Sequence, residues 1–235
     1  MKVCNNCRNT RPKCKGCGNL IGERYSEYRG FTGKYCQSCV NNTPQCISCM
    51  RPCGPNPEKL VNGNPVCREC SISAVQKKYQ LEPIIREVSR FLQLNMLMNI
   101  RTEIDFRLVD TIDNKPNWAT YRESGRFIQI NNDFTIKILA GLSRPLCIET
   151  VAHELAHAWQ AENCPHLPND ELLEGFAQWV AGKALESFGY SEMLPRLDSR
   201  DDVYGRGYRE LLQMERRLGF AGVFLEMKRV GNSPR

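Results

Sequence analysis

Two histidines one helical turn apart, with a glutamate directly after the first, are the residues of this chain best suited to do chemistry. The segment reads His153-Glu154-Leu155-Ala156-His157, and Glu174 follows seventeen residues after His157. On a helix, residues i and i+4 lie on one face, so both imidazoles can reach one ion. Two histidines and a glutamate suit a catalytic zinc, whose fourth position stays open for water. We therefore expect His153, His157 and Glu174 to bind one zinc, with Glu154 as the general base that faces the water.

Two helices joined by a short turn would bring these residues together. Apolar residues recur at helical spacing through the first segment, and the Pro-containing stretch 164–168 then ends that helix. Asn169 offers an N-cap for a second helix, and Glu174 falls in its second turn. A bare His-Glu-x-x-His segment also occurs by chance on surface helices. The helix, turn, helix order with a correctly placed glutamate favours the metal site, and hence an enzyme.

Several segments resemble known zinc peptidases. Glu174-Gly175-Phe176-Ala177 resembles the third-ligand segment of the gluzincin peptidases, notably the aminopeptidase-N type. Further stretches are similar to the peptidase domain of the plant organ-size regulators called DA-one, and the similarity spans roughly residues 80 to 232. These stretches are residues 141–144, 152–154 and 157–159, and Tyr204-Gly205-Arg206-Gly207-Tyr208-Arg209.

The DA-one proteins join LIM-type zinc modules to a C-terminal metallopeptidase. The resemblance therefore implies a zinc endopeptidase that acts on protein or peptide substrates. The ubiquitin-interacting helices of that family have no counterpart before the zinc modules here, so we do not carry over activation by ubiquitin.

Peptide hydrolysis also needs a hydrogen-bond donor for the oxygen that becomes negatively charged. Tyr204 lies in the family-like segment and is our candidate for this catalytic role. A tyrosine that packs at a loop-to-helix junction would fit the same pattern, and the two interpretations stay open at this point.

The cysteines predict structural zinc sites. Ten of the thirteen cysteines form CxxC pairs. The pairs are Cys4/Cys7, Cys14/Cys17, Cys36/Cys39, Cys46/Cys49 and Cys67/Cys70. A disulfide framework is the alternative, but residues 1–19 are polar and basic and contain no apolar signal-peptide core. We expect zinc sites and a cytoplasmic protein.

An internal repeat predicts how these pairs combine. Lys2-Val3-Cys4 matches Lys34-Tyr35-Cys36, and Pro65-Val66-Cys67 matches both, so each module opens at one CxxC, makes a Gly-rich hairpin and closes at the next. One zinc is then expected on Cys14, Cys17, Cys36 and Cys39, and a second on Cys46, Cys49, Cys67 and Cys70. This pattern resembles a LIM domain. Six residues separate Cys39 from Cys46, where LIM domains normally have two, which leaves the docking of the two halves open.

Cys4 and Cys7 have no opening pair before them. They could form a further zinc site with another donor such as Cys53, bind zinc in a second chain, or stay reduced without metal.

The expected organisation is a partial zinc knuckle at residues 1–12, a LIM-like tandem zinc module at 13–72 and a zinc metallopeptidase domain at 73–235. The fold class is α+β, gluzincin-like, with a small antiparallel sheet beside the active-site helices. We expect a helix over residues 75–98, with Pro83 in its first turn, and closing helices over 210–218 and 223–230. Strands are expected at Ile104-Phe106-Leu108, 118–121 and 127–130, with Ser124-Gly125 as a turn.

The charge is uneven along the chain. Residues 1–80 contain 13 Lys and Arg against 4 Asp and Glu, whereas residues 81–235 contain 19 against 22. A basic half can indicate nucleic-acid binding. The basic residues are spread through the hairpins, however, and each zinc bound by four thiolates would add two negative charges. We expect a solvated basic surface that suits a protein partner, and no nucleic acid. No stretch approaches 18 apolar residues, so we expect no membrane span.

The leading hypothesis is a zinc endopeptidase whose LIM-like module selects a substrate or controls access. The alternatives are a zinc-finger protein-binding or DNA-associated scaffold with a degenerate peptidase-like domain, and a DNA-associated protease.

Overall fold

The N-terminal part consists of two hairpin-and-helix repeats, as the sequence repeat predicts. In the computed structural model, which describes residues 11–112 and 123–232, the first repeat contains β1 (Tyr25–Glu27), β2 (Lys34–Cys36) and α2 (Gln37–Asn42). The second contains β3 (Glu58–Lys59), β4 (Pro65–Val66) and α3 (Arg68–Ser71). Both hairpins are antiparallel, and a cysteine directly precedes each short helix as its N-cap. The closing CxxC pair of each repeat therefore bridges the end of a strand and the first turn of a helix.

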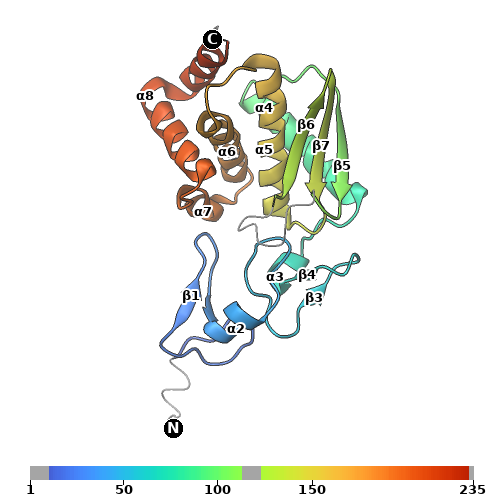
Figure 1. The fold of residues 1–235 in the computed structure, drawn as a ribbon, viewed down its shortest axis with the longest axis vertical. Helices are drawn as coiled ribbons and strands as arrows, with labels where there is room; N and C mark the ends of the chain where they lie inside the picture. The colour runs from blue at the N-terminus through green and yellow to red at the C-terminus, as the bar shows by residue number, and fades with distance from the viewer. Residues whose placement is uncertain (1–10, 113–122, 233–235) are drawn as a thin grey trace.

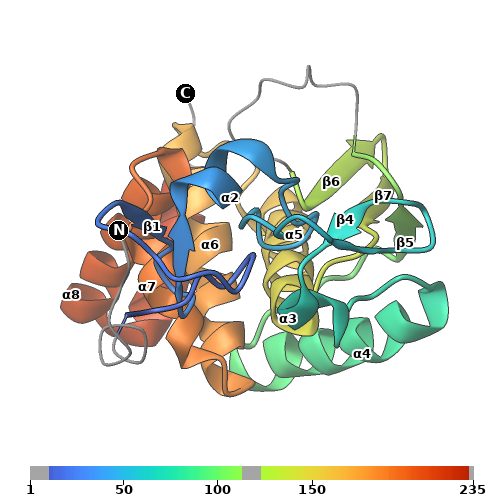
Figure 2. The same ribbon diagram turned by 90° about the horizontal axis from the view of Figure 1, so that it is seen from below.

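The two repeats pack against each other despite the lengthened spacer of residues 40–45. We call residues 11–43 the first zinc lobe and residues 44–72 the second zinc lobe. Gly54 has a φ of +87° and lies so close to Gly16 that a Cβ atom there would overlap the Gly16 carbonyl. Lys15 Nζ and Glu69 Oε1 form an ion pair of 2.6 Å between the lobes. The lobes thus form one module (Figure 2).

The sheet of the C-terminal part is mixed, so the prediction of an antiparallel sheet was wrong. Its strands are β5 (Ile104–Val109), β6 (Gly125–Ile130) and β7 (Asp133–Leu139), in the order β5-β7-β6. β6 and β7 form an antiparallel hairpin, whereas β5 pairs with β7 in parallel. The prediction failed because it left out β7, the central strand, whose alternate residues are buried. These residues are Phe134, Ile136 and Ile138.

The prediction of Ser124-Gly125 as a turn was also wrong in part. Gly125 is the first residue of β6, and the Ser124 carbonyl accepts a hydrogen bond of 2.8 Å from Leu139 N of β7. The predicted strand at 127–130 lies within β6, and the one at 118–121 lies outside the described residues. Gly125 does not reverse the chain. It allows the strand to lie close to a neighbouring helix, as described below.

A helix before the sheet confirms the expected amphipathic segment with shorter bounds. α4 (Lys78–Asn95) buries its apolar face, and Pro83 falls in its second turn, not its first. The buried residues of this face are Leu81, Ile84, Val88 and Leu92. The helix tolerates the proline at the loss of one backbone hydrogen bond near its N-terminus.

Four helices and a 3-10 turn complete the C-terminal part. They are α5 (Arg144–Asn163), α6 (Asp170–Ser187), η1 (Ser191–Met193), α7 (Leu194–Asp198) and α8 (Val203–Gly231). α5 lies between the sheet and α6, and α8 covers the far side of α6 (Figure 1). Non-helical Gly219 (φ 73°) divides α8 into the two closing helices that the sequence predicts, and the first begins seven residues earlier than expected. Within the described residues, no helix has the length and apolar composition needed to cross a membrane.

The zinc module joins the C-terminal part below α5 and α6 in Figure 1. Val75 exchanges two backbone hydrogen bonds with the segment before α5, from Val75 N to Leu142 O at 2.8 Å and from Gly141 N to Val75 O at 2.7 Å. Ser143 N donates to Ser48 Oγ at 2.8 Å. Apolar residues of the second zinc lobe belong to the same buried cluster as α4, α5 and the sheet, whereas the first zinc lobe has a small cluster of its own. The second lobe is therefore built into the main core.

Candidate metal centre

The helix α5 places the two histidines side by side in its middle. Their ring centroids are 4.7 Å apart, and His157 Nε2 lies 3.1 Å from His153 Nε2. The pair lies one turn apart on a helix that is buried on most of its surface. The i, i+4 geometry expected from the sequence is therefore present.

The turn between α5 and α6 brings Glu174 to the same point. Asn169 caps α6, because its side chain accepts a hydrogen bond of 2.8 Å from Leu172 N, as the sequence predicts. Glu174 Oε2 lies 3.2 Å from His153 Nε2 and 3.4 Å from His157 Nε2. Burial acts to raise the pKa of Glu174, but the hydrogen bonds to the two histidines hold it well below its usual range. The side chain is thus a carboxylate, the form in which it can bind a metal.

These three side chains could hold a metal ion. One donor atom from each of His153, His157 and Glu174 lies within 4.8 Å of the others. Two imidazoles and a carboxylate match the protein ligands of a catalytic zinc site. The donor set therefore fits the ion that the sequence predicts.

Gln160, which the sequence analysis missed, fixes the protonation of one histidine. Its Nε2 donates to the Leu173 carbonyl at 2.8 Å, which turns its Oε1 toward His157. That oxygen lies 2.8 Å from His157 Nδ1, so Nδ1 carries a hydrogen and Nε2 is the ring nitrogen left to bind a metal. Gln160 is buried and follows His157 by three residues on the helix. A polar residue on the apolar face at this spacing is the signal that could have identified it.

Glu154 is buried beside the three candidate metal donors and touches strand β6. Its Oε2 accepts a hydrogen bond of 2.7 Å from Phe127 N. A Cβ atom on Gly125 would lie 2.8 Å from Glu154 Oε1, so only glycine lets the strand approach α5 this closely. Burial raises the pKa of Glu154, against the effect of the neighbouring histidines and Phe127 N. A carboxyl group with a raised pKa is suited to accept and return a proton.

Tyr204 lies in the first turn of α8, at the same centre. Its ring centroid is 5.8 Å from that of His153, and the Arg200 guanidinium lies 4.5 Å from its own ring centroid. Asp202 holds Arg200 with hydrogen bonds of 2.6 to 3.0 Å and also caps α8 by accepting from Gly205 N at 3.1 Å. Burial, and then the charge of Glu174, raise the pKa of Tyr204 to about 12, so its hydroxyl remains a hydrogen-bond donor.

Glycines explain why the Glu-Gly-Phe-Ala and Tyr-Gly-x-Gly segments meet. A Cβ atom on Gly207 would lie 2.6 Å from Gly175 Cα, and one on Gly175 would lie 2.5 Å from the Gly207 carbonyl carbon. The absence of side chains at both positions lets α6 and α8 cross in backbone contact. This crossing brings Tyr204 to the helix that carries Glu174.

A cleft of about 350 Å³ borders the centre. His153, Glu154 and Tyr204 line it together with residues of β6, α6 and the zinc module. A larger groove of about 780 Å³ lies between α4 and the sheet, but none of the metal-donor clusters of the described residues lies there. The chemistry-bearing residues are therefore at the smaller cavity.

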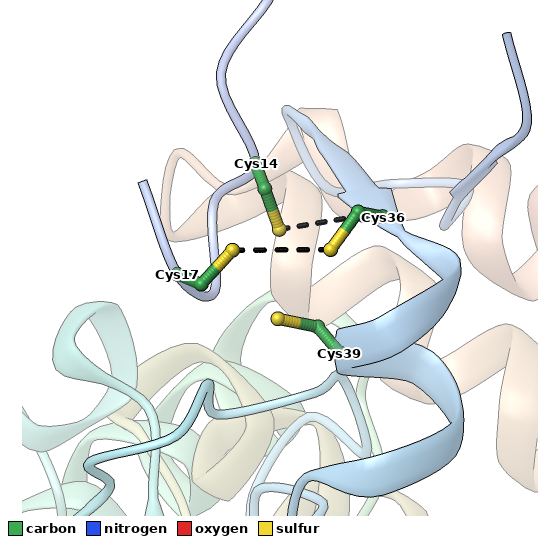
Figure 3. Close-up of side chains that lie close together, drawn as sticks. All are labelled: Cys14, Cys17, Cys36 and Cys39. Atoms are coloured by element: carbon green, nitrogen blue, oxygen red, sulfur yellow. Dashed lines mark hydrogen bonds between the residues drawn. The ribbon is translucent and has the colours of Figure 1, made fainter. Parts of the chain in front are cut away.

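The structure groups the cysteines as the repeat predicts. Two sets of four have all their sulfur atoms within 4.8 Å of one another: Cys14, Cys17, Cys36 and Cys39, and Cys46, Cys49, Cys67 and Cys70. In the first set the four sulfurs point toward one another, and Cys36 N donates to Cys14 Sγ at 3.3 Å (Figure 3). In the second, all four residues are buried. Both sets could hold zinc, and each would leave no coordination position open.

Cys53 lies against the second of these sets. Its contact with Cys46, followed by burial, raises the pKa of Cys53. Cys4 and Cys7 lie outside the described residues, so a further site that joins them to Cys53 stays a hypothesis.

Comparisons of the chain with protein-family models, with curated proteins and with solved structures give no match.

Proposed function

We propose that this chain is a zinc-dependent endopeptidase that cleaves protein or peptide substrates. The observation that supports it best is the buried Glu154 carboxyl group beside a set of three metal donors, at the edge of a cleft. A scaffold protein would have no use for a buried acid at this position, whereas a hydrolase needs one.

His153, His157 and Glu174 would hold the zinc, which when bound polarises a carbonyl group and lowers the pKa of a water molecule to about 7. Glu154 accepts the proton of the attacking water and passes it to the leaving amine. The Tyr204 hydroxyl, which stays protonated, donates a hydrogen bond to the oxygen that becomes negative. The two interpretations of Tyr204 are compatible, because the ring packs at the start of α8 and also lines the cleft.

Strand β6 offers a way to orient the substrate. It is an edge strand of its sheet, and Gly125 lines the cleft. An extended peptide that adds to this edge by backbone hydrogen bonds would pass in front of Glu154.

The test compares hydrolysis of a fluorescently labelled unfolded protein by the wild-type chain and by Glu154→Gln, at equal zinc content. We expect the rate to fall by about 10²- to 10⁴-fold, because only the general base is lost. Glu171→Gln is the matched control, since Glu171 is a half-buried glutamate of α6 and pairs with Arg206. If wild type and Glu154→Gln release peptides at the same rate, the chain is not a peptidase of this mechanism, and the scaffold alternative takes its place.

A further inference from the structure

One wall of the cleft beside the metal donors comes from the zinc module. Phe31 of the first zinc lobe and Ser48, Cys49 and Met50 of the second lobe line it. Leu146 and Thr150 of α5 line the same cavity, about two turns and one turn before His153, respectively. The cavity next to the proposed chemistry is therefore completed by residues far away in the sequence.

The position of Phe31 is fixed by the turn that carries it. Phe31 N donates to the Tyr28 carbonyl at 3.1 Å, which closes a four-residue turn at the tip of the β1-β2 hairpin. Gly30 has a φ of +73°, and a Cβ atom there would lie 2.7 Å from Arg196 Cβ. A turn with positive φ at its third residue favours glycine. The tip of the hairpin is therefore seated on α7, on the far side of the cleft from β6.

Arg51 holds the Phe31 ring from the side of the zinc module. Its guanidinium carbon lies 4.2 Å from the ring centroid. Arg51 is 2% exposed, donates from Nε to Cys49 Sγ at 3.1 Å, and pairs with Glu69 at 2.8 Å. A cation fixed on the second cysteine set thus stacks on the ring, which argues for a rigid wall instead of a loose flap.

The cavity suits one large uncharged side chain. Its volume of about 350 Å³ lies near the lower end of the range of about 300 to 1,000 Å³ for ligand pockets. Phe31, Met50 and Leu146 supply apolar surface. Apart from the candidate site's own His153 and Glu154, the charged side chains of its lining are already in ion pairs: Arg196 with Glu149, Arg200 with Asp202, and Glu123 with Arg126. A charged substrate group would therefore lose its hydration without gaining a free partner among them.

We propose that Phe31 is a specificity-determining residue, through which the zinc module selects a large apolar side chain, above all an aromatic one, beside the bond that is cut. The inference rests on the proposed peptidase function. Aromatic rings favour one another in stacked or edge-to-face contact, so an aromatic side chain gains most from this wall.

The test uses the full-length, zinc-loaded chain, because deletion of the module would expose the core that the second zinc lobe shares. Fluorogenic peptides carry Phe or Ala on one side of the scissile bond, in two series, one for each side. We expect wild type to prefer Phe in one series, and Phe31→Ala to lower the ratio of the two kcat/KM values by about tenfold. Phe31→Leu keeps an apolar side chain at this position and is therefore a variant that should fold even if Phe31→Ala does not. Its ratio of kcat/KM values should lie between those of wild type and Phe31→Ala.

Tyr25→Ala is the matched control, since Tyr25 is a 42% exposed aromatic residue of the same hairpin that does not line the cleft. A binding measurement gives a second readout: in the Glu154→Gln chain, Phe31→Ala should weaken the Kd of the labelled Phe peptide by about tenfold.

The outcomes separate the two proposals. If wild type cuts the peptides but Phe31→Ala leaves the ratio unchanged, or changes both rates equally as removal of a lid would, this inference is overturned and the peptidase proposal stands. If wild type cuts no peptide faster than Glu154→Gln does, the peptidase proposal fails and this inference fails with it.

Discussion

The cysteine sets and the His153–His157–Glu174 set differ in the number of donors and in what surrounds them. Each cysteine set brings four sulfur atoms together, which fills the tetrahedral coordination of a zinc ion. The other set brings three donors together, and it borders a cleft with the buried Glu154. All of these sets contain metal-binding residues, so the presence of such residues does not tell the two kinds of site apart. A site with four donors can stabilise a fold, whereas a site with three donors and a neighbouring acid can act on a substrate.

The two cysteine sets also differ from each other. The first set packs with Ile21 and Tyr35 in a small cluster of its own. The second set is fully buried and belongs to the main core, together with residues of α4, α5 and the sheet. Loss of the second set should therefore affect the whole molecule, and loss of the first set only its own lobe.

The largest effect is expected for Cys67→Ser in the second set. Structural zinc contributes about 10–16 kcal/mol to the folding of zinc-finger peptides, and a zinc ion on this set would couple that contribution to the main core. We expect the cooperative thermal unfolding of the whole chain, followed by near-ultraviolet circular dichroism, to be lost or to shift down by more than about 10 °C.

Cys17→Ser in the first set is the matched control. Its main unfolding transition should stay within about 4 °C of wild type, because the first lobe has a separate small core. Equal shifts for the two variants would show that the lobes do not differ in their coupling to the core.

A smaller effect is expected for Gln160→Ala, which acts on the candidate site of His153, His157 and Glu174 and leaves both cysteine sets unchanged. The change removes the acceptor for His157 Nδ1, so the ring is no longer held with its Nε2 lone pair toward the metal. Loss of such a partner typically weakens metal binding by about 10- to 100-fold. Competition with a chelator measures the affinity, with exposed Gln93 changed to Ala as the control. An unchanged affinity in Gln160→Ala would mean that the amide does not orient the ligand.

The helices that carry the metal donors could be predicted from the sequence because their signals are local. The spacing of His153 and His157, the Asn169 cap and the position of Glu174 each depend on a few neighbouring residues. The grouping of the cysteines could be predicted because the internal repeat shows where each module opens and closes, and the structure confirms which four lie together in each set.

The features of the sheet and the cleft that could not be predicted from the sequence depend on contacts between distant segments. Ser124-Gly125 has the composition of a turn, but the glycine is required by α5, which follows some twenty residues later. β7 is central because β5 pairs on its far side, and nothing within residues 133–139 indicates this pairing. Phe31 reaches the cleft only because the first zinc lobe docks both on the second lobe and on α7.

The most direct test of this account is the zinc content of the purified chain and of His153→Ala, measured by mass spectrometry of the metal. We predict three zinc ions per wild-type chain and two in His153→Ala, because the two cysteine sets keep theirs. A zinc content that is the same in both proteins would contradict the account, since it would mean that His153, His157 and Glu174 do not form a metal site.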